Sequence, residues 1–299
     1  MPFNPFMDAK DVTARPVGDL IKNNLLIRIL SALAMIPPVL AATYMGYPYF
    51  NLLIAIAVAA MAWEWRCMTQ RGQFGYQGVI LVAGLLGCIV AASIGAPIHA
   101  FLLVGLVAIT FIAINATSRL TVETPSTSDI VNSRGALWMA AGAFYIGIPS
   151  VSLIWIRTDW DNGLLVVVWL LVLVWAADSG AYVAGRLIGG PKMAPKISPN
   201  KTWAGLGGCA VAAALSGVVV AHFAGLDGFL KPLLISALIG VISQGGDLVE
   251  SGVKRHFKVK DSSNLIPGHG GVLDRVDALL AAVSAAALIS LVSKGALMT

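Results

Sequence analysis

Apolar stretches of about 20 residues, the length that crosses a bilayer, follow one another along this chain and restrict its fold more than any other feature. Hydrophobic residues make up 58% of the sequence and charged residues only 12%, which places the chain among integral membrane proteins. The sequence predicts an all-α polytopic membrane protein with about nine transmembrane helices. They are expected at residues 25–46, 49–65, 77–96, 98–117, 136–156, 163–187, 203–223, 232–250 and 272–293.

The distribution of Lys and Arg predicts the orientation of these helices. With the N-terminus in the cytosol, 17 of the 20 basic residues face the cytosol and only Arg157, Lys231 and Lys294 lie outside, which is a strong positive-inside bias. We therefore expect a multi-pass protein of the cell (inner) membrane, with its N-terminus and charged loops in the cytoplasm. The net charge of +5 fits basic loops beside an anionic leaflet, and no nucleic-acid partner is expected.

The N-terminal half shows little sign of chemistry. We divide the chain into a cytosolic tail at 1–24, N-terminal transmembrane helices at 25–160 and a C-terminal transmembrane catalytic region at 161–299. Glu64 is the only acidic residue near a membrane segment among the first five spans. The favoured interpretation is an interfacial carboxylate beside Arg66 rather than a functional group.

Polar residues first gather at the end of the sixth span. Asp178, Tyr182 and Arg186 stand at i, i+4 and i+8, so they share one face of the expected helix. Asp178 and Arg186 are therefore candidates for substrate binding. Taken alone, they are explained equally well by an ion pair with a purely structural role.

The loop after this span has the properties of an anion site. Pro191, Pro195 and Pro199 recur every four residues, which excludes a regular helix and stiffens an extended path. Thr202 stands at the N-cap of the next helix, whose free N–H groups and positive end would favour an anion flanked by lysines. An ordinary basic loop would account for the charge but not for the order of Pro, Ser and Thr. The predicted phosphate-binding residues are Lys192, Lys196, Ser198, Lys201 and Thr202.

The densest charge lies between Ser243 and Asp277, where the eighth and ninth spans flank a polar loop. Charged residues are costly within a bilayer and usually face a wet, functional cavity. Asp247 lies on a polar face of the eighth span, and Asp274 and Asp277 form another at the start of the ninth. Clustered carboxylates repel one another in a low dielectric, and a divalent cation removes that cost. We predict a divalent cation bound by Asp247 and Asp274.

Glycines and basic residues complete this candidate site. The segment PGHGG at 267–271 is a sharply turned backbone that can approach a phosphate closely. Carboxylates, a divalent ion, basic side chains and a Gly-rich backbone together indicate phosphoryl or nucleotidyl transfer. The further candidate residues here are Lys254, Arg255, Lys260, His269, Gly270, Gly271 and Arg275.

The motifs of this region also resemble those of a known family. The longest are S-x-x-K-R-x-x-x-x-K-D at 251–261 and P-G-H-G-G-x-x-D-R-x-D at 267–277. Shorter ones are DSGAY-x-x-GR at 178–186, ISP-x-KTW at 197–203 and SQ-x-GDL-x-E at 243–250. Together they are similar to the integral-membrane phosphatidate cytidylyltransferases, or CDP-diacylglycerol synthases, over roughly the C-terminal 120 residues.

This resemblance implies transfer of CMP from CTP to phosphatidate, which releases pyrophosphate and leaves CDP-diacylglycerol in the membrane. The implied partners are CTP, phosphatidate and membrane lipid, and the implied cation on Asp247 and Asp274 is Mg²⁺. The implied catalytic residues are Asp247, Asp274, Asp277, Lys254 and Arg255, the last two on the lipid phosphate. The residues implied to contact the triphosphate are Lys192, Lys196, Lys201 and Arg275. The chain departs from the family at Asn200 and Ala204, where Lys and Glu are common.

Several alternatives stay open at this point. A second cation on Asp277 or Asp178 and a homodimer are both compatible with the sequence, and His269 would either orient a phosphate oxygen or only satisfy its turn. A CTP-dependent lipid kinase would use similar groups but release CDP instead of pyrophosphate. A membrane transporter would also hold buried charges, but it would favour paired broken helices in two repeated halves, and the sequence has no visible repeat.

Overall fold

The computed structural model describes residues 34–70, 72–120 and 127–292, and eight helices in this part of the chain are long and apolar enough to cross a membrane. A shorter apolar helix, Ala34–Met45, precedes them. The prediction of an all-α polytopic membrane protein is confirmed. The eight helices are α2 Tyr49–Thr69, α3 Gly75–Ser93, α4 Pro97–Leu120, α5 Thr127–Asp159, α6 Gly163–Leu187, α7 Trp203–Phe223, α8 Leu230–His256 and α9 Leu273–Val292.

Each predicted span from 49–65 onward coincides with one of these helices. The first predicted span, 25–46, is helical from Ala34 onward, while its beginning and the tail at 1–24 lie outside the described residues. Helix α8 continues past the predicted end at 250 to His256, so it carries the basic residues that precede the polar loop. Of the basic residues that predict the orientation, Lys10, Arg15, Lys22, Arg28, Arg71 and Lys294 also lie outside the described residues.

The chain forms two compact units. The first comprises residues 1–151 and 259–275, and the second comprises 152–258 and 276–299. The first unit therefore receives the polar loop before α9, although this loop is distant in sequence from its other helices. The functional division at residue 160 stays a prediction.

In the first unit, α2 packs against α3, and α3 packs against α4. Trp65 of α2 is buried, and its indole N–H donates a hydrogen bond to the carbonyl oxygen of Trp138 in α5 at 2.7 Å. A Cβ on Gly142 would lie 2.4 Å from that indole nitrogen, so glycine leaves the space that the ring occupies. A large aromatic side chain thus fixes α2 against α5 in this unit.

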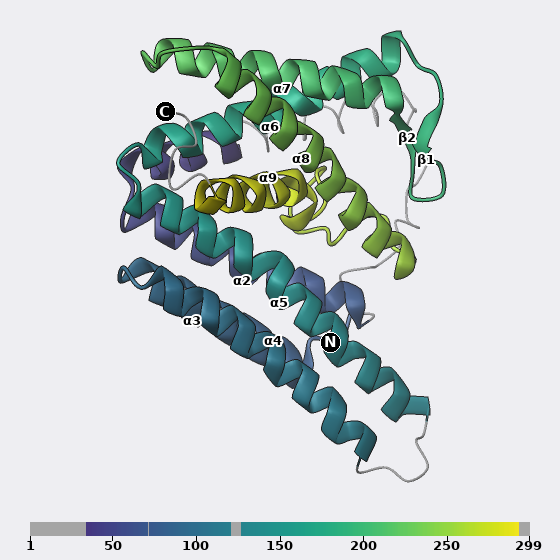
Figure 1. Cartoon of the computed structure of the whole chain (residues 1–299). Helices are drawn as coiled ribbons and strands as arrows, with labels where there is room; N and C mark the ends of the chain where they lie inside the picture. The colour runs from purple at the N-terminus through teal and green to yellow at the C-terminus, as the bar shows by residue number, and fades with distance from the viewer. Residues whose placement is uncertain (1–33, 71, 121–126, 293–299) are drawn as a thin grey trace. The chain divides into compact units, whose positions relative to one another are not determined.

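In the second unit, α6 and α7 lie side by side, and α7 packs against α8 (Figure 1). Two glycines bring the backbones of α6 and α7 into direct contact. A Cβ on Gly208 would lie 2.5 Å from the carbonyl oxygen of Gly180, and a Cβ on Gly180 would lie 2.5 Å from that of Gly208. Small residues at helix contacts are the usual means by which membrane helices pack closely, because lipid gives no hydrophobic drive between them.

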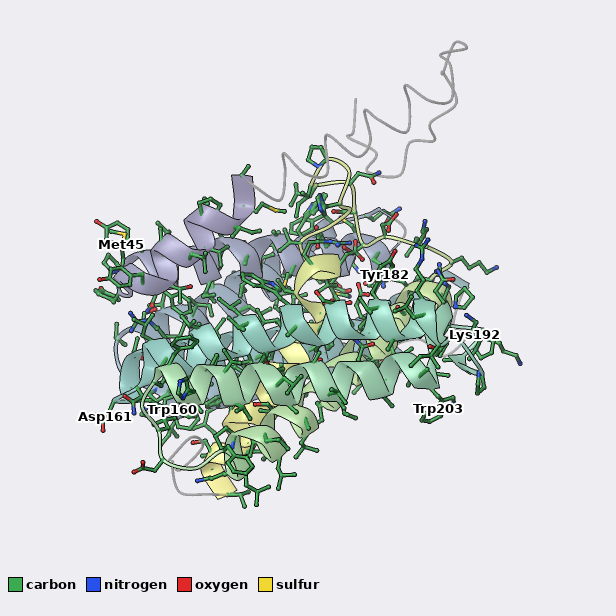
Figure 2. All side chains as sticks on the ribbon, turned by 90° about the horizontal axis from the view of Figure 1, so that it is seen from above. Met45, Trp160, Asp161, Tyr182, Lys192 and Trp203 are labelled. Carbon is green, nitrogen blue, oxygen red and sulfur yellow. The ribbon has the colours of Figure 1, made fainter. Side chains whose placement is uncertain are left out.

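A two-stranded antiparallel hairpin of β1, Lys192–Ala194, and β2, Ser198–Thr202, joins α6 to α7. Lys192 pairs with Thr202, which confirms the extended path that the prolines predict. Figure 2 shows Lys192 and Trp203 at one end of the α6 and α7 pair and Trp160 at the other. Thr202 has an extended backbone, and its hydroxyl accepts a hydrogen bond from the N–H of Gly205 at 3.0 Å, so the predicted N-cap is also confirmed.

The cap predicts a measurable contribution to stability. Thr202 is buried, so Thr202→Val removes the hydrogen-bond acceptor and nearly preserves the shape of the side chain. We expect the free energy of unfolding to fall by about 1 kcal/mol, the usual cost of losing an N-cap. The measurement is the Tm of the purified protein in detergent. Thr202→Ser retains the hydroxyl and should keep most of the stability, and equal Tm values for Val and wild type would contradict the role of the cap.

Candidate active site

In the second unit, one glutamine connects the polar residues of α6, β2 and α8. The Gln244 side-chain N–H donates to Asp178 Oδ1 at 3.1 Å, and the backbone carbonyl oxygen of Gln244 accepts from Lys201 Nζ at 3.3 Å. Lys201 Nζ also lies 2.6 Å from Asp247 Oδ2. The structure thus brings together Asp178, Lys201 and Asp247, three of the candidate residues. Gln244 was not singled out, although it stands in the motif that contains Asp247.

Asp247 is the centre of the acidic part of this cluster. Its second oxygen, Oδ1, accepts a hydrogen bond from the Ser251 hydroxyl at 3.2 Å, and 31% of its side chain is exposed. Asp277 lies within electrostatic reach of the negative charges of Asp247 and Asp178 and of the positive charge of Lys254. An accessible carboxylate in an acidic neighbourhood is the type of oxygen ligand that a hard divalent cation prefers.

The described residues contain no group of three His, Cys, Asp or Glu side chains arranged to hold a metal ion. Mg²⁺ commonly needs fewer protein ligands, because one or two carboxylates and the phosphates of the substrate complete its coordination. The carboxylate of Asp247 fits this kind of incomplete protein coordination.

A glycine places Asp247 beside α9. A Cβ on Gly246 would lie 2.4 Å from the Cβ of Ala281 and 3.1 Å from the carbonyl oxygen of Asp277. The backbone of α8 therefore contacts α9 one residue before Asp247. This contact explains how two carboxylates on different helices come within electrostatic reach.

Three of the predicted basic residues of the second unit, Lys254, Arg255 and Arg186, have partners in the protein. Lys254 forms an ion pair with Glu250, a completely buried carboxylate one helical turn earlier. The Arg255 Nε–H donates to the carbonyl oxygen of Ile197 at 3.3 Å and so connects the end of α8 to the hairpin. The Arg186 guanidinium donates to the Tyr182 hydroxyl at 2.7 Å, which confirms that these two side chains share a face of α6. Lys192 and Lys196 are exposed on the hairpin, and Ser198 is half-buried.

The first unit holds the remaining candidates, in the loop before α9 and in the first turn of this helix. Asp274 Oδ2 accepts hydrogen bonds from the N–H of Ser262 at 2.8 Å, the hydroxyl of Ser262 at 3.0 Å and the N–H of Gly271 at 2.8 Å. Gly270 has a left-handed φ of 89°, and a Cβ there would lie 2.8 Å from the same oxygen. The loop thus wraps closely around one carboxylate oxygen.

Three other candidates lie around this loop. The backbone N–H of His269 donates to the carbonyl oxygen of Ile266 at 3.0 Å and helps to close the turn. Its side chain is half-buried, and Lys260 and Arg275 are exposed. The exposed cations are accessible to an anionic ligand.

Glu64 of α2 lies against the same loop, and its hydrogen-bond partners are residues of this loop and the start of α9 rather than the neighbouring Arg66. The side chain is completely buried and accepts hydrogen bonds from loop residues, including the Ser263 hydroxyl at 2.7 Å and the N–H of Val272 at 2.8 Å. The only sequence signal for this role was an acidic residue within an apolar run, which is itself a sign of function in membrane proteins.

Known proteins are similar to this chain over most of its length. The chain matches the Cytidylyltransferase family over residues 26–292. The chain belongs to this family. Among its relatives, the phosphatidate cytidylyltransferase of Brucella suis is 37% identical over 264 residues, which cover 88% of this chain and 92% of the relative. That of Pseudomonas aeruginosa is 37% identical over 263 residues, with 86% and 93% covered, and that of Haemophilus influenzae is 34% identical over 285 residues, with 86% and 95% covered.

Neighbouring glycines of this cytidylyltransferase-family chain provide a matched test of the contact between α8 and α9. Gly246→Ala introduces a Cβ that collides with Ala281, whereas a Cβ on Gly245 meets nothing within 4 Å. We expect Gly246→Ala to lower the activity on CTP by on the order of tenfold, since small displacements of catalytic groups are costly. Gly245→Ala should retain nearly all activity. Equal turnover of the two variants, measured per folded molecule, would contradict a close approach at Gly246.

Proposed function

We propose that this protein transfers CMP from CTP to phosphatidate, giving CDP-diacylglycerol and pyrophosphate for phospholipid biosynthesis. The observation that carries this proposal is the similarity to proteins named phosphatidate cytidylyltransferase over 86–88% of the chain. The accessible Asp247 among basic and amide groups supports it, since nucleotidyl transfer depends on positioning and charge neutralisation.

The reaction needs no nucleophile from the protein. An oxygen of the phosphatidate phosphate attacks the α-phosphorus of CTP, and a new phosphorus–oxygen bond forms there. The bond from the α-phosphorus to the oxygen shared with the β-phosphate breaks, and pyrophosphate leaves with that electron pair. The protein must therefore align two phosphates and stabilise the charge that shifts onto the leaving group.

We propose Asp247 and Asp274 as the carboxylates for Mg²⁺. When bound, the ion would neutralise phosphate charge during the transfer. Lys201 pairs with Asp247, and we propose that it turns toward the triphosphate when CTP binds. Lys192, Lys196 and Arg275 are also proposed to contact the triphosphate. Lys254 and Arg255 are proposed for the lipid phosphate, and Glu250 keeps the ammonium group of Lys254 in place.

The proposed location is the inner membrane, with the loops that carry these residues in the cytoplasm. The positive-inside bias of the sequence supports this orientation. It also agrees with the chemistry, because CTP is a nucleotide of the cytosol and the lipid substrate stays in the bilayer.

The deciding experiment uses purified full-length protein, phosphatidate, Mg²⁺ and CTP labelled in separate samples at the α- and γ-phosphates. Label from the α-phosphate should enter the lipid, and label from the γ-phosphate should appear in pyrophosphate. Transfer of the γ-label to lipid with release of CDP would instead establish a lipid kinase. CTP that remains intact would overturn the proposed function.

The metal proposal predicts a non-additive pair of variants. Asp247→Asn and Asp274→Asn preserve shape and remove a charge, so each should lower turnover by on the order of a hundredfold, the scale of electrostatic transition-state groups. The double variant should be little worse than either single one, because groups that act on one ion are not independent. The measurement is turnover against Mg²⁺ concentration. Normal activity with an unchanged Mg²⁺ dependence in Asp274→Asn would remove this residue from the metal site.

A further inference from the structure

Glu64 is completely buried, and its hydrogen-bond donors come from the loop before α9 and from the first residue of that helix. Glu64 Oε1 accepts from the Ser263 hydroxyl at 2.7 Å and the Val272 N–H at 2.8 Å. Glu64 Oε2 accepts from the Leu273 N–H at 2.8 Å and the Ser262 hydroxyl at 3.2 Å. These four donors occupy the acceptor capacity of a carboxylate, and a buried carboxylate without them would be very costly.

Two of these bonds fix the beginning of α9. Leu273 is the first residue of the helix, and the N–H groups of a first helical turn have no partner inside the helix. Glu64 provides that partner from α2, 209 positions away in sequence. A negative group at a helix N-terminus is also favoured by the helix dipole. Glu64 therefore determines where α9 starts and how the preceding loop enters it.

The same loop orients Asp274. The Ser262 hydroxyl lies 3.2 Å from Glu64 Oε2 and 3.0 Å from Asp274 Oδ2, and its single proton serves both carboxylates. The N–H groups of Gly271 and Val272 are consecutive, and the first bonds Asp274 while the second bonds Glu64. A shift of the loop away from Glu64 must therefore displace the donors that hold Asp274.

The glycine motif supports this connection. A Cβ on Gly271 would lie 2.0 Å from the Ser262 hydroxyl oxygen and 2.5 Å from Glu64 Oε1. Gly271 is thus required for the close approach of the loop to Glu64. The sequence suggested a different reason for this glycine, namely contact with a phosphate.

We propose that Glu64 is a positioning residue: it anchors the loop at 262–273 and so holds the carboxylate of Asp274 in the orientation that nucleotidyl transfer requires. The anchoring stands on the hydrogen bonds alone, and only its effect on turnover rests on the proposed function.

The sharpest variant is Glu64→Gln, because it keeps the volume and replaces one acceptor oxygen by an NH₂ group. Each oxygen of Glu64 accepts a hydrogen bond from a backbone N–H. In the glutamine variant the side-chain NH₂ group must therefore point at one of these N–H groups, and that hydrogen bond is lost. The matched control is Thr69→Val on the same helix. Thr69 is also buried, but its hydroxyl donates to carbonyl oxygens of its own helix, those of Trp65 and Arg66.

Hydrogen exchange of the full-length protein, without metal or substrate, measures the anchoring directly. In Glu64→Gln the amides of 262–273 should exchange on the order of tenfold faster, as expected for the loss of one or two buried hydrogen bonds. The rest of the protein should exchange as in the wild type, and Thr69→Val should leave this peptide unchanged. Unchanged exchange at 262–273 would overturn the proposal, and so would an increase across the whole protein, which is the sign of a general folding defect.

Turnover then tests the effect on Asp274. Glu64→Gln should lower turnover per folded molecule and raise the Mg²⁺ concentration for half-maximal activity, and adding it to Asp274→Asn should cause little further loss. Losses that multiply in the double variant would show that Glu64 acts independently of Asp274 and overturn the positioning role. If the wild type makes no CDP-diacylglycerol, the proposed function fails, while the exchange result still decides the anchoring.

Discussion

The cost of burying a carboxylate among apolar helices governs the polar structure of both units. An unpartnered charge in such surroundings is several kcal/mol unfavourable, so each buried acid must lie where donors converge on it. Glu64 meets this demand with two hydroxyls and two backbone N–H groups, and Glu250 meets it with the ammonium group of Lys254. Asp274 meets it with the backbone and hydroxyl of the loop before α9. These hydrogen bonds and the ion pair hold each carboxylate in one orientation, which is a property that a functional site requires.

Glycine contributes to the same structure in three distinct ways. At Gly208 it lets two helix backbones touch, and at Gly246 it brings α8 against α9 near Asp277. At Gly271 it admits a loop to a buried glutamate. In each place a Cβ would collide with atoms of the protein, so the requirement is steric and local.

The pairing of Lys201 with Asp247 has a consequence for the proposed chemistry. A lysine and a divalent cation would both neutralise the same carboxylate, so each weakens the binding of the other. Binding of CTP with Mg²⁺ would resolve this competition, because the triphosphate offers Lys201 another anion. The protein would thereby keep Asp247 neutralised before the substrate arrives and use the same lysine afterwards.

The length and number of the apolar stretches in the sequence by themselves determined the helical membrane fold and placed α2 to α9 correctly. The regular prolines and the cap at Thr202 determined an extended connection between α6 and α7, since both act within a few residues. The motifs likewise singled out Asp178, Lys201 and Asp247 as candidates, and the structure shows that these three residues contact one another through Gln244 and an ion pair.

Only the tertiary structure decided the role of Glu64, because its partners lie about 200 positions downstream and no local pattern encodes such a contact. The same holds for Gln244. Its side-chain amide and backbone carbonyl meet Asp178 and Lys201 only when α6 and the hairpin pack against α8. Local rules specify where helices and turns form, whereas the cost of burying polar atoms selects which distant residues must meet.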